Sequence, residues 1–435
     1  MSVKGVLQGR DCRMRRVRCI RGLGGMVGQS LAILAIVSFL TGCYRTRLGD
    51  PTHPAIMHRP PPMQFQRGPL AELPRYDPQS GKGWQVDVRS CDLGRLDLRT
   101  RLADLKQASF DSLTRWPDRL PDGFDPKAIL QLNRNPGLGV RRLHARGITG
   151  RGVGIGMIDQ TLLVDHWEYR DQLRSYEEIH VMDRGAQMHG PAVASIAVGR
   201  TVGVAPGANL YYVAETHGRQ ILRSFRWDFQ WVARSIDRLL AINASLPAAQ
   251  RIRVITITVG WTSSRPGGAA ADAAVARATA AGIFVISTGL ERTHGLAFHG
   301  LGRDSMSDPD LAASYGPGVW WAAKFLDGSQ RFEPGIRLLV PMDCRTVASP
   351  TGPEDYVYYP EGGWSWAVPW IAGLYALACE VDPGITPERF WAEALATGRT
   401  IELQHNGEKV TFGTVADPVG LIERLQAKRT VGRTD

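Results

Sequence analysis

Cysteine is scarce in this sequence, and so are long apolar runs. Six cysteines occur in 435 residues, two of them in a leader that is interpreted below as removed. With Cys43 assigned to lipid attachment, Cys91, Cys344 and Cys379 remain, so at most one disulfide can form and a framework of several disulfides is excluded. The apolar run at residues 31–40 is too short for a transmembrane helix, which needs about 20 apolar residues.

A strongly basic surface is also missing, although the formal net charge is +10. Residues 1–42 hold seven of the 52 Lys and Arg residues and one of the 42 acids, so the rest of the chain has 45 basic against 41 acidic residues, a balance of +4. That balance is ordinary for a soluble surface and does not indicate a nucleic-acid partner.

The leader has the features of an export signal. A basic segment precedes the apolar run at residues 31–40, and Leu40-Thr41-Gly42-Cys43 follows. These four residues resemble the lipobox of bacterial lipoproteins, in which the cysteine receives a lipid and becomes the mature N-terminus. We therefore predict a signal peptide over residues 1–42, export, and a lipid anchor at Cys43 on a cell-envelope membrane, facing the periplasm or the cell surface. An uncleaved anchor or a plain secretory signal is the alternative.

Strand and helix patterns alternate from Gly137 onward. Short apolar runs bounded by turn residues are typical of buried parallel strands, and their alternation with helical stretches predicts a doubly wound, mostly parallel α/β sheet. The strand patterns cover residues 153–159, 210–214, 253–259 and 283–287, and the helical patterns cover residues 221–244 and 269–281.

A single serine lies in an unusual setting at residues 362–373, G-G-W-S-W-A-V-P-W-I-A-G. The two glycines allow a tight turn, and Pro369 is tolerated in the first turn of the apolar helix that we expect to follow. A hydroxyl at a helix N-terminus lies beside free backbone N–H groups, which suit a developing oxyanion. On its own, Ser365 also fits a surface position in a glycine-rich turn.

Two other residues change that interpretation. Asp159 lies at the carboxyl end of the first apolar run, where open α/β sheets bind their ligands. His189 precedes Gly190 and a helix of small residues, a position that faces a crevice. The chain order is Asp159, His189, Ser365, which is the order of the subtilisin triad and differs from the chymotrypsin and α/β-hydrolase orders.

Three blocks of the sequence resemble the subtilase family of serine proteases over about residues 137–400. G-V-G-I-G-M-I-D resembles its aspartate strand, H-G-P-A-V-A-S-I-A its histidine block and G-W-S-W-A-V-P-W-I-A-G its serine block. The resemblance implies a subtilisin-like three-layer fold with about seven strands. It implies that Ser365 attacks the scissile carbonyl, that His189 transfers the proton and that Asp159 orients the imidazole. It also places Thr258, Val259 and Gly260 at an edge that pairs with an extended substrate peptide.

The sequence departs from the family at the oxyanion site. Subtilases usually carry an asparagine there that donates a hydrogen bond to the oxyanion, and Leu290 stands at the matching position. Loss of that donor typically lowers turnover by about 10²–10³. The Ser365 backbone N–H remains as a donor to the oxyanion, and the side chains of Thr293 and His294 are candidates to replace the asparagine. Tryptophans flank Ser365 where Thr and Met are usual. Asp304, Asp308 and Asp310 are interpreted as a solvated turn, and we predict no metal or cofactor.

The sequence thus predicts an exported, membrane-tethered serine endopeptidase acting on peptides or proteins, without a nucleic-acid partner. The alternative is a subtilase-fold pseudoprotease that binds peptides but hydrolyses them poorly because of Leu290. A lipase or esterase lacks support, because the G-x-S-x-G elbow is absent and His405 is the one histidine after Ser365. The predicted organisation is a signal peptide (1–42), a Pro-rich tether (43–85), an N-terminal extension packing on the catalytic domain (86–136), a subtilase-like catalytic domain (137–425) and a basic tail (426–435).

Overall fold

The computed structural model describes residues 55–221 and 224–431. The chain divides into two units, Met1–Arg47 and Leu48–Asp435, and all described residues belong to the second unit. The signal peptide and Cys43 therefore lie outside the described residues, and the predictions for them stay predictions.

A six-stranded sheet organises the described unit, and every neighbouring pair of its strands is parallel. All six residues of β6 are buried, as expected for a central strand covered on both faces. The four strands predicted from apolar runs are confirmed to within two residues at each end. In spatial order the strands are β1 (Ala55–Ile56), β7 (Leu173–His180), β8 (Asn209–Glu215), β6 (Gly154–Asp159), β11 (Ile252–Ile257) and β12 (Phe284–Ser287).

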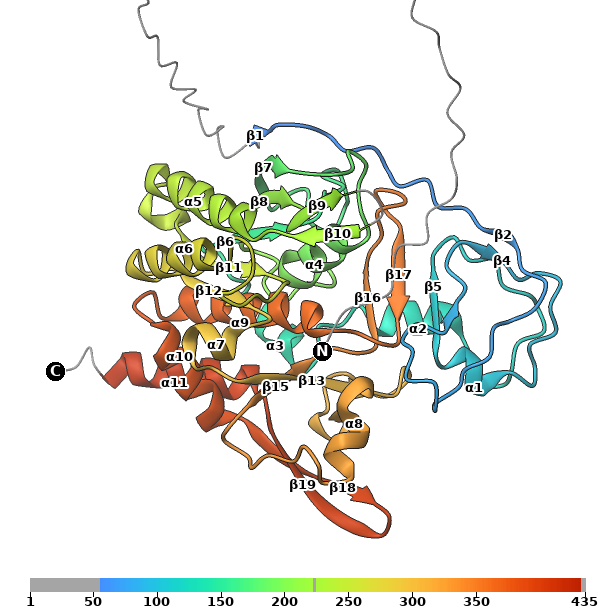
Figure 1. The fold of residues 1–435 in the computed structure, drawn as a ribbon. Helices are drawn as coiled ribbons and strands as arrows, with labels where there is room; N and C mark the ends of the chain where they lie inside the picture. Colours follow the sequence, from blue (N-terminus) through green and yellow to red (C-terminus); the bar gives the residue numbers. More distant parts are fainter. Residues whose placement is uncertain (1–54, 222–223, 432–435) are drawn as a thin grey trace, which may run out of the picture. The chain divides into compact units, whose positions relative to one another are not determined.

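Helices cover both faces of this sheet, which gives three layers (Figure 1). Ile155 and Met157 of β6 belong to the core that includes α4 (His189–Val198) and α9 (Trp364–Val381). Side chains on the other face, such as Ile158, belong to a second core with α5 (Gln230–Ser245) and α6 (Gly268–Ala280). The alternation follows from the two-residue period of a strand, and the predicted α/β fold class is confirmed.

One helix prediction was wrong. The helical pattern at residues 221–244 predicted one continuous helix, but α5 begins at Gln230 and a hairpin precedes it. In that hairpin β9 (Gly218–Ile221) pairs antiparallel with β10 (Ser224–Trp227). The alternating Phe225 and Trp227 are typical of strands.

After β12 the chain leaves the central sheet and builds a second, five-stranded sheet. This is why the central sheet has six strands where about seven were expected. The second sheet has the order β14 (Tyr315–Pro317), β13 (Phe298–Arg303), β15 (Leu338–Pro341), β19 (Glu408–Val415), β18 (Arg399–His405). The helices of this half are α7 (Leu290–His294), α8 (Val319–Leu326), α10 (Pro387–Thr397) and α11 (Pro418–Val431), and two short 3-10 turns lie at Ala248–Gln250 and Ala312–Ser314.

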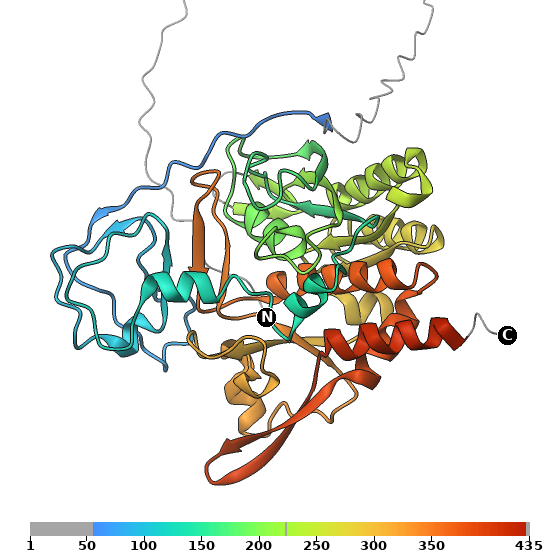
Figure 2. The ribbon, with the colours of Figure 1, turned by 180° about the vertical axis from the view of Figure 1, so that it is seen from behind.

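The residues before 137 join the rest through a third sheet of four strands. Its order is β16 (Arg345–Ala348), β17 (Tyr356–Tyr359), β5 (Ala108–Asp111), β3 (Val86–Asp87). The segment after β1 runs extended over the domain towards β2 and β4, as both views show (Figures 1 and 2). The remaining elements of this part are β2 (Gly68–Pro69), β4 (Cys91–Asp92), α1 (Leu102–Leu105), α2 (Pro126–Leu132) and α3 (Val140–Ala145).

Within the described ranges, no helix combines the length and hydropathy that a membrane crossing needs. Cys91, Cys344 and Cys379 are all buried and free. Cys379 is a small buried residue of α9.

Candidate active site

Asp159 ends β6, and its carboxylate is the most heavily bonded group of the site. The side chain is 1% exposed. Oδ1 lies 2.7 Å from His189 Nδ1 and accepts a bond from the Gln160 N–H at 2.8 Å, while Oδ2 accepts a bond from the Thr258 hydroxyl. Burial alone would raise the pKa of Asp159, but the nearby His189 and these bonds outweigh it and lower the pKa. The group is therefore suited to orient an imidazole and to stabilise its protonated form.

His189 is the first residue of α4, and its side chain is 21% exposed. Gly190 brings this helix close to the end of β6. A Cβ at position 190 would lie 2.5 Å from Gln160 O and 2.7 Å from the Tyr212 hydroxyl. A glycine is thus required for the approach that joins His189 to Asp159.

This packing predicts the effect of Gly190→Ala. The added methyl group must push α4 away from β6, which we expect to lower stability by about 1–3 kcal/mol and to lower any hydrolytic activity by lengthening the Asp159–His189 bond. Gly384→Ala is the matched control, because a Cβ there would meet nothing closer than 3.7 Å. Free energies of unfolding in denaturant and rates of peptide hydrolysis are measured for both variants. Equal losses in the two variants would contradict this account.

Ser365 is the second residue of α9, which begins at Trp364 after an extended Gly363. The helix thus starts earlier than Pro369 suggested, and Pro369 lies in its second turn. Gly362 is required before it, since a Cβ there would lie 2.2 Å from Met342 O. The Ser365 hydroxyl donates to Thr258 O at 3.2 Å. No hydrogen bond joins it to His189 in the described structure, so attack requires a rotation of the hydroxyl towards the imidazole.

Thr258 contacts both Asp159 and Ser365. The register pairs Ile158 with Ile257, so Asp159 and Thr258 follow side by side at the ends of β6 and β11. The Thr258 hydroxyl donates to Asp159, and its carbonyl accepts from Ser365. The structure brings Thr258 together with Asp159, His189 and Ser365, and this double contact was not predicted. Val259 is half-buried and Gly260 exposed, so the chain reaches solvent here, as an edge that binds a peptide must.

Part of this arrangement lies in a segment that matches a known protein family. Residues 150–323 match the subtilase family. The matched segment contains Asp159, His189 and Leu290 and ends before Ser365. The match supports the subtilase family and, at that level, a serine peptidase.

Two solved structures are similar to this chain. One, the prenylagaramide maturation protease PagA, is 15% identical with a TM-score of 0.44, covering 66% of this chain and 99% of that chain. The other, a cold adapted subtilisin-like serine proteinase, is 20% identical with a TM-score of 0.39, covering 57% of this chain and 83% of that chain.

The position that the sequence resemblance assigns to the oxyanion donor carries an apolar side chain. Leu290 is the first residue of α7, is fully buried and belongs to the larger core. The candidate substitutes have other contacts. The Thr293 hydroxyl bonds to the carbonyls of Gly289 and Leu290 at 3.4 Å, and the His294 ring packs edge-on against Phe284, where burial lowers its pKa. These contacts give no support to either residue as a replacement donor.

The two tryptophans beside Ser365 lie in different environments. Trp366 is 5% exposed, and its ring centroid lies 5.4 Å from that of His189. Trp364 packs against Phe298 and Trp320 at 5.6 and 5.5 Å. Both indole N–H groups are buried without an acceptor among the described residues. The altered pocket expected from these residues therefore has an aromatic wall on the histidine side.

A second histidine–carboxylate pair lies next to the triad. Glu215 ends β8, the neighbour of β6, and is fully buried beside His217. Burial opposes protonation of His217, but Glu215 and Asp159 outweigh it and raise the pKa. The positive charge of His217 in turn helps to keep Asp159 ionised.

Asp343 holds the loop that precedes Ser365, and this role was not predicted. It is 3% exposed and follows β15. Oδ1 accepts the Gly362 N–H at 2.7 Å, and Oδ2 accepts the Val319 N–H at 2.8 Å. Burial raises the pKa of Asp343 to about 7, although the two backbone bonds lower it. The nearby Glu361 adds a smaller upward shift of this pKa. Asp343 thus anchors the turn that leads into Ser365.

The raised pKa predicts a pH-dependent stability. Between its ordinary pKa of 3.8 and about 7, the folded chain keeps a proton on Asp343 that the unfolded chain releases, so this contribution to folding is lost as pH rises. The loss is about 4 kcal/mol over the window, at roughly 1.4 kcal/mol per pKa unit. Relative to the parent, Asp343→Asn should therefore gain free energy of unfolding from pH 4 to pH 8, as measured in urea. A difference that stays constant with pH would contradict the assignment. Asp118→Asn, at an exposed position, is the control.

Proposed function

We propose that this chain is a subtilase-type serine endopeptidase whose triad is Asp159, His189 and Ser365. The observation that carries the proposal is the 2.7 Å contact between Asp159 Oδ1 and His189 Nδ1, with Ser365 held next to the same pair through Thr258. In the reaction, the Ser365 hydroxyl turns to His189 Nε2, loses its proton and attacks the scissile carbonyl. His189 then passes the proton to the leaving amine, and water hydrolyses the acyl-enzyme.

The oxyanion is stabilised more weakly in this proposal than in a site with an asparagine. The backbone N–H of Ser365 lies in the first turn of α9, where N–H groups have no partner within the helix. Leu290 adds no donor. We therefore expect a slow peptidase, and the competing function is peptide binding without efficient hydrolysis, which Leu290 and the Ser365–Thr258 bond favour.

Hydrolysis of a mixed peptide library tests the proposal. The purified protein and its Ser365→Ala variant are incubated with the library, and new termini are identified by mass spectrometry. We expect cleavage products from the parent that are absent with the variant. Binding of library peptides to both proteins without products from either would favour the pseudoprotease.

Export and membrane tethering are a separate part of the proposal, supported by the lipobox-like residues 40–43. Cys43→Ala in the full chain should move the protein from the membrane fraction to the soluble fraction of the cell envelope. An unchanged distribution would count against the lipid anchor.

A further inference from the structure

The segment after β1, called the strap here (residues 57–67), presents alternate side chains to the domain. Met63 and Phe65 are half-buried, whereas Pro62, Gln64 and Gln66 are exposed. Backbone bonds fix the strap on both sides of these residues. The Met63 N–H donates to Pro350 O at 2.8 Å, the Ala186 N–H donates to Pro61 O at 2.9 Å, and the Arg67 N–H donates to Ser90 O at 3.2 Å. The strap is thus a fixed wall against the domain.

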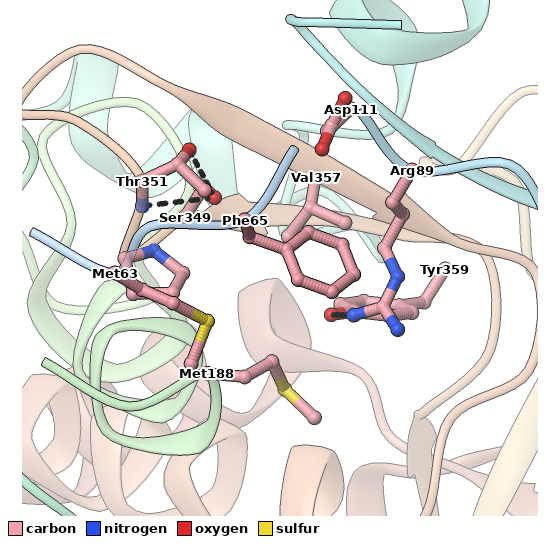
Figure 3. A pocket seen from close by; sticks show the side chains of 10 residues that line it. Met63, Phe65, Arg89, Asp111, Met188, Ser349, Thr351, Val357 and Tyr359 are labelled. Atoms are coloured by element: carbon pink, nitrogen blue, oxygen red, sulfur yellow. Dashed lines mark hydrogen bonds between the residues drawn. The ribbon is translucent and has the colours of Figure 1, made fainter. Parts of the chain in front are cut away.

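Met63 and Phe65 form one side of a pocket that Met188, Val357 and Tyr359 complete (Figure 3). The empty space between the lining residues is about 290 Å³, part of it open to solvent. Because this figure includes open solvent, the enclosed space is smaller, and at most one side chain fits.

The charged groups in the pocket wall already have hydrogen-bond partners. Arg89 forms two bonds to Asp87 at 2.8 and 2.9 Å and a third to the Tyr359 hydroxyl at 2.9 Å. Its guanidinium also lies 5.4 Å from the Phe65 ring centre. Asp111 accepts bonds from both the N–H and the hydroxyl of Ser90. An uncharged, apolar side chain therefore fits these walls better than a charged one.

Two contacts place the pocket on the histidine side of the catalytic centre. Met188 directly precedes His189, and Tyr359 packs against Trp366 at 5.8 Å, which in turn packs against His189 at 5.4 Å. The imidazole must deliver its proton to the leaving amine, so the leaving group departs on the side of His189. In the proposed mechanism the acyl part pairs with Thr258–Gly260, so it lies on the other side of the scissile bond from the leaving group.

We propose that this pocket is a leaving-group subsite that receives an apolar side chain from one of the first two residues after the scissile bond. The N-terminal strap then belongs to the substrate site and helps to set its specificity. This inference rests on the proposed function and deepens it.

The test compares internally quenched peptides with one acyl part and with Gly, Leu, Asp or Lys on the leaving side. We expect the parent to prefer Leu over Gly by about tenfold in kcat/KM, a typical discrimination for an apolar pocket. Phe65→Ala should reduce this ratio to about twofold, because kcat/KM should fall more for the Leu peptide than for the Gly peptide. The Gly peptide, which presents no side chain to the pocket, is the reference for the rate of catalysis itself. Gln64→Ala, on the exposed side of the same strap, should behave as the parent.

Three results would overturn the inference. One is an unchanged Leu to Gly ratio in Phe65→Ala protein that melts as the parent does. Another is an equal fall in kcat/KM for all four peptides, because the strap would then have a structural role. The third is an equal rise in kcat/KM for all peptides in Phe65→Ala protein, because the strap would then obstruct the site.

A binding experiment keeps the inference separate from the proposed function. A peptide with a diazirine analogue of leucine on its leaving side, close to leucine in size, is bound to Ser365→Ala protein and irradiated. Cross-links to Met63, Phe65 or Met188 support the subsite even if the parent hydrolyses nothing, which would overturn the proposed function alone. Cross-links elsewhere overturn the subsite.

Discussion

Ser365→Ala is expected to lower kcat for a peptide substrate by about 10⁴–10⁶, to the residual rate that binding alone supports. His189→Ala should cost about as much, because the hydroxyl has no other positioned base. Asp159→Asn should cost about 10⁴, since an amide at 2.7 Å from His189 Nδ1 favours the wrong tautomer. Steady-state kinetics of the three single variants and the triple variant give the comparison.

The triple variant provides the decisive control. When residues act as one unit, removing any one of them already removes most of the activity. The kcat of the triple variant should therefore lie within about tenfold of the kcat of Ser365→Ala. Losses that multiply would show that the three residues act independently and would contradict the triad. Thermal melts of each variant separate a lost site from a lost fold.

Leu290→Asn is expected to raise kcat by about 10², because an amide N–H at this position restores a missing oxyanion donor. The gain has a cost in stability, since Leu290 is fully buried in the larger core and an amide there leaves apolar contacts unfilled. The measurement is kcat and unfolding free energy for the variant and the parent.

Leu290→Ala is the matched control for this prediction. It removes the same apolar contacts without adding a donor, so it should lose stability and gain no activity. If Leu290→Asn is no faster than the parent, another group already stabilises the oxyanion, or the site does not reach an oxyanion at all. In the first case the parent protein still forms the acyl-enzyme. In the second case it does not, which favours the pseudoprotease.

Much of the site could be predicted because it lies at the ends of elements with clear sequence patterns. Asp159 follows a continuous apolar run, and His189 follows a turn and begins a helix of small residues. Parallel strands place their carboxyl ends at one edge, so the meeting of these two residues follows from the topology. The resemblance of three blocks to subtilases added the roles of the residues.

The features that could not be predicted depend on contacts between segments far apart in the sequence. Asp343 bonds to Gly362 and Val319 across three loops, and nothing in M-D-C marks it as an anchor. The strap was interpreted as part of a tether from its proline content, yet β1 pairs with β7 and Met63 bonds to Pro350. The hairpin before α5 was mistaken for a helix because strand alternation over four residues is too short to separate the two periods.

The Ser365–Thr258 bond is the feature that most clearly separates the two candidate functions. A peptidase must exchange it for a bond to His189, whereas a peptide-binding protein has no need to do so. An extended substrate that pairs with residues 258–260 competes for the same Thr258 carbonyl. Substrate binding and release of the serine hydroxyl are therefore coupled in the proposed mechanism.

Labelling with a fluorophosphonate serine probe tests the central claim most directly, because the probe needs an activated serine and no particular peptide. The purified parent protein is compared with Ser365→Ala and His189→Ala, and the labelled peptide is identified by mass spectrometry. We predict one label on Ser365 in the parent and none in either variant. A folded parent that stays unlabelled, or a label that persists in His189→Ala, would contradict the assembled triad.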